Sequence, residues 1–449
     1  MYNAEEIIYK LQDLGHEAYL VGGYVRDMIL GIPNKDKDIA TSADPDTLME
    51  IFKDQKIKTA GKSFLVTFIN GIEVATFRTD EYNGLNDKNV KIIITKSSKE
   101  DAKRRDLSIN SLFFDPISKK VIDHVNGQDD LKNKVIRFNG DPKKRIWEDP
   151  NRIVRACRFL AKIDGRFSIE TFSALYQSRD YVKDSISRER IRIEIIKAMS
   201  IKKASIFFRA LYDIDVLKYI LPSLNKSYLH PGGPYHIEDV FDHCMMAGDH
   251  CSTKYPLIKL AAYLHDVGKP ISSRINPMTN DIWFEGHEQT GCVAAGTELA
   301  QLRFSAEEII LISYLIKLHM RISYERMTPK SIRRTLRTLT SCNIPYQSLL
   351  RVSICDKMGG LKSQKYYTIK DVFQLAKSFR KVVNEKPVRK YGDLKLNGID
   401  IMEITGLKPG KEVGEILDYL MDQTLEYPEL NEKEKLIELI KGDIHGTNC

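Results

Sequence analysis

Two aspartates, Asp36 and Asp38, stand two residues apart in the segment DKDIAT (36–41). In an extended chain, residues two apart point to the same side, so this spacing predicts two carboxylates that project to one place. Neighbouring carboxylates repel each other unless a cation lies between them, and Mg²⁺ prefers carboxylate oxygens together with substrate phosphates. The pair therefore predicts a magnesium site.

A paired-glycine turn, Gly22-Gly23, precedes these aspartates by about a dozen residues, in LVGGYVRD. The pattern indicates a strand, a turn and a helix. Glycines there let backbone N–H groups approach a phosphate near the positive end of the helix. Arg26, one turn into that helix, is a candidate for binding the same anion. Glu73, in the strand-like run IEVATFR, is a candidate third carboxylate; an ordinary glutamate that faces water is the alternative.

The segment EDPNR (148–152) contains a second pair of interest, Asp149 and Arg152. If the segment is helical, residues three apart share a face. Cytosine presents an amino group at N4 beside an acceptor at N3, and adenine presents the same pair at N6 and N1. A carboxylate beside a guanidinium complements both bases and leaves guanine and uracil unpaired. The alternative is a surface ion pair at the start of a helix.

A third candidate site surrounds His265-Asp266, in KLAAYLHDVGKP. The apolar run predicts a helix that ends near this dipeptide, with Gly268 as its C-cap. Adjacent His and Asp can ligate two neighbouring metals, or one metal through different atoms. A lone helical histidine is usually a core or surface residue, but five of the ten histidines are candidates beside this His-Asp dipeptide, which favours a metal cluster. The further candidates are His236, His243, His287, His319 and Asp356.

The composition is that of a soluble globular chain: 449 residues, 42% hydrophobic and 29% charged, with a net charge of +8. No stretch approaches the ~20 apolar residues of a membrane span, and the amino terminus lacks the pattern of a signal peptide. Seven cysteines without a CxxC pair predict free thiols in a reducing cytoplasm. The basic excess is clustered, as in stripes that follow a phosphate backbone, although solvated helix faces are the alternative. The clusters are Lys103-Arg104-Arg105, Lys143-Lys144-Arg145, Arg152/Arg155/Arg158 and Arg188/Arg190/Arg192.

Short β-rich runs alternate with helical stretches over residues 1–140, which predicts a small α/β domain. Helical periodicity dominates from about residue 141 onward. The Pro/Gly-rich stretch HPGGPYH (230–236) is the clearest internal break, and a weaker one lies near 386–398. The predicted domains are a head (1–140), a helical neck (141–228), a third domain (229–362) and a helical tail (363–449).

GGYVRD and DKDIAT resemble the head of polymerase-β-type nucleotidyltransferases, specifically the class II CCA-adding enzymes and the bacterial poly(A) polymerases. The resemblance continues through RRDLSINSLFF (104–114), residues 127–160 and SRERIRIEI (187–195), with five motifs in the expected order over roughly the first 200 residues. It implies a polymerase-β-like α/β head, followed by a mostly α-helical neck, an HD body and a tail. The neck and tail are implied to bind RNA.

The resemblance also implies an activity: template-independent addition of C and A to the 3′ end of tRNA from CTP and ATP, with Mg²⁺ and release of pyrophosphate. In-line attack of the RNA 3′-hydroxyl on the α-phosphorus would occur at Asp36 and Asp38. Asp149 and Arg152 would read the incoming base. The residues implied near the sugar and triphosphate are Arg105, Asp106 and Asn110, and those implied near the triphosphate or the RNA are Arg155, Arg158, Arg188 and Arg190.

The histidine-rich region resembles the HD phosphohydrolase superfamily, which accompanies CCA-adding heads in some bacterial enzymes. The resemblance implies phosphatase or 2′,3′-cyclic phosphodiesterase activity with a second divalent metal (Mg, Mn or Ni), or a domain kept as a scaffold and RNA platform. The implied ligands are His243, His265, Asp266 and Asp356, with His287 and His319 as second-metal or phosphate groups. Residues 396–440 resemble the tail of HD-containing members and carry no assigned site.

One departure concerns the loop EYNGLNDKNVK (81–91), which lacks the arginines that many CCA-adding members carry there. That loop is thought to help switch specificity from C to A. CC-adding, A-adding and poly(A)-adding activities therefore stay open. Two other classes are a chain that is mainly an HD hydrolase of RNA ends and a non-catalytic tRNA-binding factor; the intact Asp36 and Asp38 pair argues against both.

Overall fold

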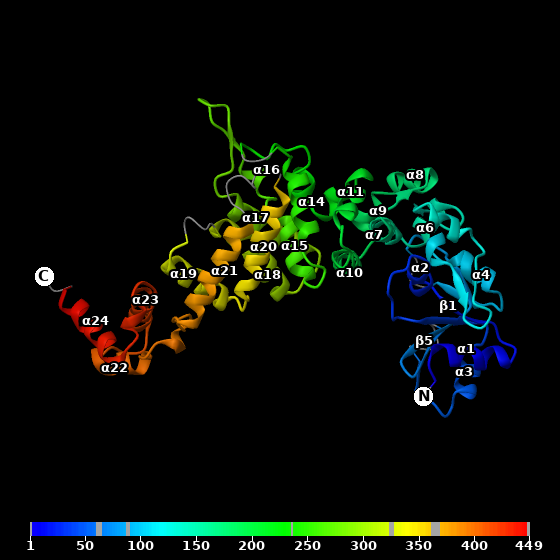
Figure 1. Cartoon of the computed structure of the whole chain (residues 1–449), viewed down its shortest axis with the longest axis horizontal. Helices are drawn as coiled ribbons and strands as arrows, with labels where there is room; N and C mark the ends of the chain where they lie inside the picture. Colours follow the sequence, from blue (N-terminus) through cyan, green and yellow to red (C-terminus); the bar gives the residue numbers. More distant parts are fainter. Residues whose placement is uncertain are drawn as a thin grey trace. The chain divides into compact units, whose positions relative to one another are not determined.

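The computed structural model describes residues 2–59, 65–86, 90–234, 237–322, 327–360 and 369–446. His236 and residues 87–89 of the loop at 81–91 lie outside this part. The chain divides into two compact units, Met1–Ile220 and Leu221–Cys449. Figure 1 shows the sheet and its helices in the first unit and an all-helical body in the second, apart from one short two-stranded ribbon.

A seven-stranded sheet forms the centre of the amino-terminal part, in the order β3-β4-β5-β2-β1-β8-β9. Its strands are β1 (Ala18–Val21), β2 (Asp38–Thr41), β3 (Ile57–Thr59), β4 (Val66–Ile69), β5 (Ile72–Thr76), β8 (Phe113–Asp115) and β9 (Lys120–Ile122). A separate antiparallel ribbon pairs β6 (Arg78–Glu81) with β7 (Lys91–Ile94). The predicted α/β head followed by a mostly helical remainder is confirmed.

The strand register brings the candidate catalytic segments together at one end of the inner strands β1, β2 and β5. We call this end of the strands the sheet edge. β1 and β2 are antiparallel, with Val21 opposite Asp38, so the glycine turn that follows β1 lies beside the start of β2. β2 and β5 are parallel, with Ile39 opposite Val74. The residues that precede this pair, Asp38 and Glu73, therefore lie level with each other on neighbouring strands.

Helix α1 (Ala4–Asp13) shows how the sequence builds the support of this sheet. Asn3 and Glu6 form a capping box at its start. Its buried residues recur at helical spacing, and this face packs on β1 and β2. The other helices of the head are α2 (Gly23–Ile29), α3 (Pro45–Ile51), α4 (Ser98–Arg104) and α5 (Gly127–Lys132), with a 3₁₀ turn, η2 (Ser108–Asn110).

The remainder of the first unit is helical, apart from two short parallel strands, β10 (Val135–Ile136) and β11 (Arg166–Phe167). Its central helix is α7 (Arg152–Ile163), which packs against α10 and α11 with its apolar face while its arginines face the head. The other helices are α6 (Pro142–Glu148), α8 (Ile169–Gln177), α9 (Tyr181–Asp184), α10 (Arg188–Met199), α11 (Ser205–Asp213) and α12 (Leu217–Ile220).

The second unit packs a bundle of helices around α14, α15, α17, α18 and α20. The bundle elements are α13 (Pro222–Lys226), α14 (Val240–His250), α15 (Pro256–Leu264), α16 (Lys269–Ser272), α17 (His287–Gln301), α18 (Ala306–Leu318), η3 (His319–Arg321), α19 (Pro329–Ser341), α20 (Tyr346–Gly359) and α21 (Ile369–Asn384). A short ribbon pairs β12 (Arg274–Ile275) with β13 (Ile282–Trp283).

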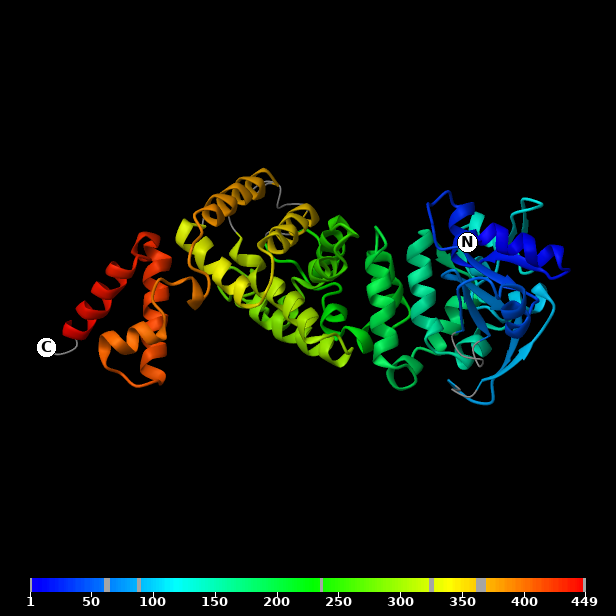
Figure 2. The ribbon, with the colours of Figure 1, turned by 90° about the horizontal axis from the view of Figure 1, so that it is seen from below.

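The last helices of the chain, orange to red in Figure 2, enclose a small apolar core of their own. They are η6 (Tyr391–Asp393), α22 (Gly398–Thr405), α23 (Lys411–Glu426), η7 (Pro428–Leu430) and α24 (Lys433–Gly446). Among the described residues, no helix combines the length and the apolar character that crossing a membrane requires.

Candidate functional site

A cavity of about 900 Å³ opens at the sheet edge of the first unit, where the head meets α7 and α10. It collects nearly all the residues that the sequence nominates for nucleotide and metal binding. The predicted residues that line it are Gly22, Gly23, Arg26, Asp36, Asp38, Arg105, Asp106, Asn110, Asp149, Arg152, Arg155 and Arg158. Arg190 of the neck also lines it, whereas Arg188 and Glu73, which is exposed on β5, lie outside the lining.

The carboxylates at the sheet edge influence one another electrostatically. Asp36 is exposed and Asp38 is half-buried. The pKa of Asp38 is raised to about 6: burial is the largest cause, the negative charges of Glu73 and Asp36 add to it, and the Arg105 guanidinium opposes them. Asp38 therefore lies close enough to two other acids for their charges to act on it. A divalent cation would relieve this repulsion, so the residues present fit the Mg²⁺ site expected from the sequence.

The glycine turn lies directly beside two arginines of the cavity. Gly22 has φ +68°, in the left-handed region that favours glycine. A Cβ placed on Gly22 would lie 3.8 Å from Nη1 of Arg105, and one on Gly23 would lie 3.6 Å from Nη2 of Arg26. Arg26 itself is buried and held, since it donates to Asn110 Oδ1 at 2.7 Å. The turn thus presents backbone and guanidinium groups to the same space.

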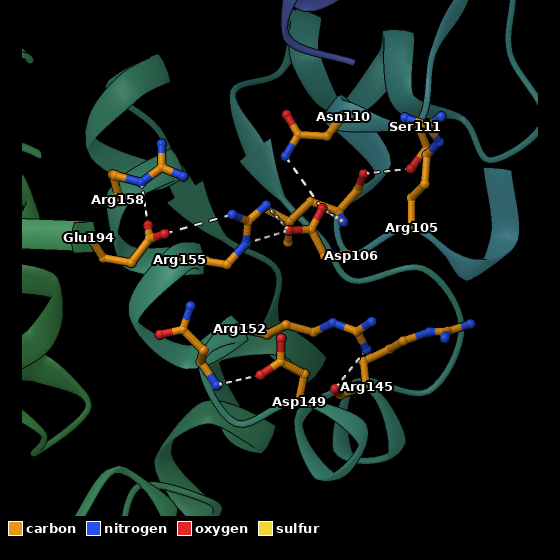
Figure 3. Close-up of polar contacts among 12 residues, drawn as sticks. Arg105, Asp106, Asn110, Ser111, Arg145, Asp149, Arg152, Arg155, Arg158 and Glu194 are labelled. Carbon is orange, nitrogen blue, oxygen red and sulfur yellow. Dashed lines mark hydrogen bonds and ion pairs between the residues drawn. The ribbon is translucent and has the colours of Figure 1, made fainter. Parts of the chain in front are cut away.

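A continuous polar network joins η2 to the neck helices, as Figure 3 shows. Arg155 donates to Asp106 Oδ2 from Nε and Nη2, at 3.0 and 2.8 Å. Burial acts to raise the pKa of Asp106, but Arg155 holds it below its ordinary value. Asn110 donates to the other oxygen of Asp106 at 3.5 Å. On the far side, Glu194 of α10 accepts from Arg158 and lies 3.7 Å from Arg155 Nη1.

The segment 148–152 does not form the helix on which the base-reading geometry was expected. Helix α6 ends at Glu148, Asp149 is extended at φ −147° and ψ 97°, and α7 begins at Arg152. The cause is Pro150, which disfavours helical geometry in the residue before it. The expectation of a shared helical face is therefore wrong. A turn replaces it, in which Arg152 N donates to Asp149 O at 3.0 Å.

The two side chains of this turn line the same cavity but have different partners. Asp149 Oδ2 accepts from Arg190 Nη2 at 2.7 Å. Arg152 donates from Nη1 to Glu148 Oε2 at 2.7 Å and to the Arg145 carbonyl at 2.8 Å. Figure 3 shows Asp149 and Arg152 side by side below the network. Asp149 and Arg152 therefore do not form the surface ion pair that was the alternative, because each side chain has another partner.

Several lining residues had no assigned role from the sequence. Arg78 and Asp80 of β6 form an ion pair of 3.1 Å at the cavity, and Tyr82 follows them. Glu194 and Lys197 of α10 complete the neck wall. The only signal for Glu194 is its place within SRERIRIEI, because its partners lie 36 and 39 residues away in the chain.

In the second unit, Asp266 lies at the centre of four buried histidines. Two groups of potential metal ligands share it: His243, His265 and Asp266, and Asp266, His287 and His319. Nε2 of His265 lies 3.4 Å from Asp266 Oδ2, and Nε2 of His287 and His319 lie 3.3 and 3.4 Å from Oδ1. Asp356 Oδ1 lies 3.2 Å from His243 Nε2. The six ligands that the HD resemblance implies therefore come together, while the further candidate His236 lies outside the described residues.

Three histidines of this cluster are oriented by backbone carbonyls. Nδ1 of His265, His287 and His319 lies 2.9, 2.8 and 2.6 Å from the carbonyl oxygens three residues earlier. Such contacts fix the ring and leave Nε2 free for a metal, as in known histidine metal sites. Nε2 of His287 is buried without a well-aligned hydrogen bond among the described residues. The residues of both groups could therefore hold divalent cations, and Asp266 belongs to each group.

The approach of α17 to this cluster depends on Gly268. A Cβ at this position would lie 2.0 Å from the His287 carbonyl oxygen and 2.5 Å from Gly291 N. The glycine was expected to be the C-cap of the preceding helix, and this is wrong: α15 ends at Leu264, and Gly268, at φ −78°, precedes α16. Its physical role is close packing, which lets His287 reach Asp266.

Comparisons with known proteins match three parts of the chain. Residues 18–137 match the poly A polymerase head domain, residues 166–227 match the probable RNA and SrmB-binding site of polymerase A, and residues 281–440 match the putative tRNA nucleotidyltransferase domain 2. The chain is 28% identical over 455 residues to the CCA-adding enzyme of Ligilactobacillus salivarius, covering 97% of this chain and 95% of that protein.

The chain belongs to the family of CCA-adding enzymes and bacterial poly(A) polymerases. It is also 36% identical to the CCA-adding enzyme of Bacillus pumilus, over 53% of this chain and 60% of that protein. Poly(A) polymerase I of Salmonella typhi is 34% identical, over 51% of this chain and 52% of that protein. Membership makes the chain a nucleotidyltransferase, an enzyme class that uses a divalent metal.

Solved structures of this family share the fold. The crystal structure of the Bacillus stearothermophilus CCA-adding enzyme in complex with CTP aligns with a TM-score of 0.70 at 22% identity, over 99% of this chain and 98% of that one. The Thermotoga maritima CCA-adding enzyme complexed with tRNA aligns with a TM-score of 0.54 at 20% identity, over 98% and 94%. At these identities the likeness establishes the architecture of this family member.

The raised pKa of Asp38 predicts a stability effect. Because its folded value of about 6 lies above the ordinary 3.8, the protonated carboxyl favours the folded state, and this stabilisation is lost as the pH rises through about 6. Without divalent metal, we expect Asp38→Asn to increase the free energy of unfolding at pH 7.5 by ~1 kcal/mol, a value reduced for solvent screening. This gain corresponds to a rise of about 2 to 4 °C in the melting temperature. At pH 3, where the Asp38 carboxyl is mostly protonated in the folded and the unfolded chain, the thermal melts of the two proteins should nearly coincide. A lower melting temperature for Asp38→Asn at pH 7.5 would contradict the crowded-carboxylate interpretation.

Proposed function

We propose that this chain adds C and A to the 3′ end of tRNA from CTP and ATP and releases pyrophosphate. One observation supports this most strongly: a single cavity holds the acidic pair, the glycine turn and the pair Asp149 and Arg152. The relatives strengthen the proposal, since the CCA-adding enzyme of Ligilactobacillus salivarius matches over nearly the whole chain. Partial CC- or A-addition and poly(A) synthesis are the alternatives within the same chemistry.

The proposed reaction forms a bond between the RNA 3′-oxygen and the α-phosphorus and breaks the bond to the β-phosphate. Asp36 and Asp38 would hold Mg²⁺, with Glu73 adding negative charge beside them. Mg²⁺ bound there would lower the pKa of the attacking hydroxyl and neutralise phosphate charge. Positioning and charge neutralisation dominate phosphoryl transfer, and Arg105 beside the glycine turn supplies a fixed cation for the triphosphate.

The polar network gives the neck arginines a rigid arrangement in this proposal. Arg155 is held by Asp106 and Glu194 together, so its position does not depend on the nucleotide. A cation that is fixed before substrate binds costs little reorganisation during the reaction. Asp106 and Asn110, which are joined to this network, would contact the sugar.

Base selection is assigned to Asp149 and Arg152. In the structure Asp149 is paired with Arg190 and Arg152 with Glu148, so each charge is compensated before the nucleotide enters. The amino group of cytosine or adenine would donate to the Asp149 carboxylate, and the adjacent ring nitrogen would accept from the Arg152 guanidinium. Guanine and uracil would instead place a carbonyl oxygen against the Asp149 carboxylate and an N–H group against the Arg152 guanidinium, so neither hydrogen bond could form.

This assignment predicts a loss of selectivity when the carboxylate is removed. Asp149→Ala should lower kcat/KM for CTP and ATP by about 100-fold while UTP and GTP change little, because only the amino-bearing bases lose a hydrogen bond. Single-nucleotide addition with each triphosphate measures this. Asp129→Ala, an exposed acid of α5 outside the cavity, is the matched control. An equal loss for all four triphosphates would assign Asp149 a structural role only.

The proposed activity can be tested with three tRNA transcripts, ending before the first C, after the first C, and after CC. Each is incubated with labelled CTP or ATP alone, and the added lengths are read. The proposal expects C on the first two transcripts and a single A on the third. Long A tracts would favour poly(A) synthesis. C on the first two transcripts without A on the third, or A on the third transcript only, would identify a partial enzyme.

A second activity is proposed for the histidine cluster, because it presents buried ligands in two groups around one carboxylate. We assign it two divalent cations (Mg, Mn or Ni) and hydrolysis of phosphate esters at RNA ends, such as 2′,3′-cyclic phosphates. The alternative is a scaffold that holds metal without hydrolysis. The domain limits of 140, 228 and 362 and a cytoplasmic location stay predictions from the sequence.

A further inference from the structure

Lys37 separates the two aspartates of the proposed magnesium site in the sequence. Asp36 and Asp38 line the cavity of the head, whereas Lys37 is not among the residues that line it. This alternation is that of an extended segment, in which successive side chains point to opposite sides. The backbone therefore directs one positive charge away from the place where the two carboxylates point.

The direction of the backbone alone does not keep this charge away from the carboxylates. Neighbouring Cα atoms are about 3.8 Å apart, and the lysine ammonium stands on a flexible stem of four carbons. The side chain of Lys37 is 33% exposed, so solvent leaves it room to move. A free ammonium at this position can turn back and pair with Asp36 or Asp38, where it competes with a divalent cation for the same oxygens.

Glu5, in the first turn of α1, holds the ammonium of Lys37 in place. Lys37 Nζ donates to Glu5 Oε1 in a direct ion pair. The same ammonium lies 5.5 Å from the ring centroid of Tyr24, a residue of α2 that lines the cavity. Two groups from two different helices thus fix the charge of Lys37 next to the cavity but outside its lining.

The position of Glu5 follows from the way α1 is attached to the sheet. Asn3 and Glu6 cap the start of this helix, and its apolar face packs on β1 and β2. β2 begins at Asp38, directly after Lys37. The ion pair therefore ties the acidic segment to a helix whose own position depends on neither nucleotide nor metal.

Two other cations of the head cavity are also fixed by carboxylates. Arg105 donates from Nε to Asp101 Oδ2 at 3.0 Å, and Arg26 donates from Nε to Asp27 Oδ1 at 2.9 Å. Both guanidinium groups line the cavity, where they are available to a triphosphate. Lys37 differs from them, because its partner holds its charge outside the lining rather than within it.

We propose that Glu5 is a positioning residue of the nucleotidyltransferase site: by pairing with Lys37, it keeps a competing ammonium away from the carboxylates that bind the divalent cation. This inference rests on the proposed function, which assigns Mg²⁺ to Asp36 and Asp38. Glu5 touches neither the nucleotide nor the metal and acts only through Lys37. Removal of Glu5 therefore weakens metal binding, and removal of Lys37 cancels that loss.

The test measures CTP-dependent binding of Mn²⁺ to the full-length wild type, Glu5→Gln, Lys37→Gln and the double variant, from the electron paramagnetic resonance signal of free Mn²⁺. We expect Glu5→Gln to raise the Kd for Mn²⁺ about three- to fivefold, the scale of a partly exposed ion pair. In the Lys37→Gln background, Glu5→Gln should change this Kd by less than about 1.5-fold, because no ammonium is left to release. The Mg²⁺ concentration for half-maximal nucleotide addition should follow the same pattern, with kcat at saturating Mg²⁺ unchanged.

Glu6→Gln is the matched control, because Glu6 is the neighbouring acid of α1 and its side chain accepts from Asn3 N. It removes the same charge without releasing Lys37 and should bind Mn²⁺ like the wild type. If Glu5→Gln weakens Mn²⁺ binding equally with and without Lys37, Glu5 acts by its charge at a distance and the inference is wrong. Wild-type binding by Glu5→Gln would also contradict it. These two results leave the metal site intact, whereas a wild-type chain without CTP-dependent Mn²⁺ binding would overturn the proposed metal site as well.

Discussion

Asp38→Asn is expected to reduce nucleotide addition by at least about 1000-fold, which corresponds to ~4 kcal/mol of transition-state stabilisation. Asp38 is half-buried at the sheet edge, and its pKa is raised first by this burial and then by the charges of Glu73 and Asp36. The amide keeps the shape of the side chain but removes the charge that would bind Mg²⁺. Asp36→Asn should have an effect of similar size. Single-turnover addition of one C to a tRNA transcript, with and without Mg²⁺, measures both.

For this interpretation to hold, the substitutions must slow the chemical step of nucleotide addition and leave tRNA binding unchanged. Asp13→Asn, an exposed acid at the end of α1, is a matched control in the same unit and should retain full activity. The affinity for tRNA in the absence of nucleotides should be unchanged in all three variants. Normal addition by either cavity variant would remove Asp36 and Asp38 from the active site.

Asp266→Asn should abolish metal binding in the second unit, because this carboxylate belongs to both groups of ligands. We expect the content of Mn²⁺ or Ni²⁺ after loading to fall from two per chain to none, and any phosphodiesterase activity on 2′,3′-cyclic phosphates to fall at least about 100-fold. His319→Gln should remove one metal only, because it contributes to one group. Metal analysis after gel filtration provides the count.

Folding and metal binding can be separated in this experiment. Asp266 also pairs with the buried Lys269 at 2.6 Å, so its removal is expected to destabilise the unit. His319→Gln spares that pair. His250→Gln, an exposed histidine on α14, is the control and should keep both metals. If His319→Gln retains the full metal content, the two-group arrangement is wrong. Nucleotide addition should stay within about twofold in each folded variant.

Local patterns predicted the catalytic edge of the head well. The order strand, glycine turn and helix around Gly22 and the following acidic strand are short-range features, and the observed β1, α2 and β2 follow them. The pairing that brings Asp38 level with Glu73 depends on the register of β2 and β5, which are separated by more than thirty residues. Only a family resemblance or coordinates can supply that pairing.

The segment 148–152 shows where sequence reasoning failed despite a visible signal. Pro150 disfavours a helix at Asp149, but the shared face of Asp149 and Arg152 was expected only if the segment is helical. The partners of this segment were equally hidden, since Arg190 lies 41 residues beyond Asp149. Ion pairs between distant helices leave no local signature, so the positioning role of the neck was not predictable residue by residue.

In the histidine cluster, the residue types revealed the ligands but not their arrangement. His and Asp composition nominated all six, whereas the shared position of Asp266 follows from the crossing of α15, α17 and α18. Gly268 was assigned a capping role because glycine often ends helices. Its true constraint is a neighbouring backbone only 2.0 Å from where a Cβ would stand, and that requires the packed structure.

The most direct test of the central claim is CTP-dependent binding of Mn²⁺ at Asp36 and Asp38. Electron paramagnetic resonance measures this binding as a decrease in the signal of free Mn²⁺. It should use protein carrying Asp266→Asn, so that the histidine cluster does not contribute. The account predicts that CTP increases Mn²⁺ binding in this background and that adding Asp38→Asn abolishes the increase. Equal CTP-dependent binding with and without the Asp38 carboxylate would contradict it.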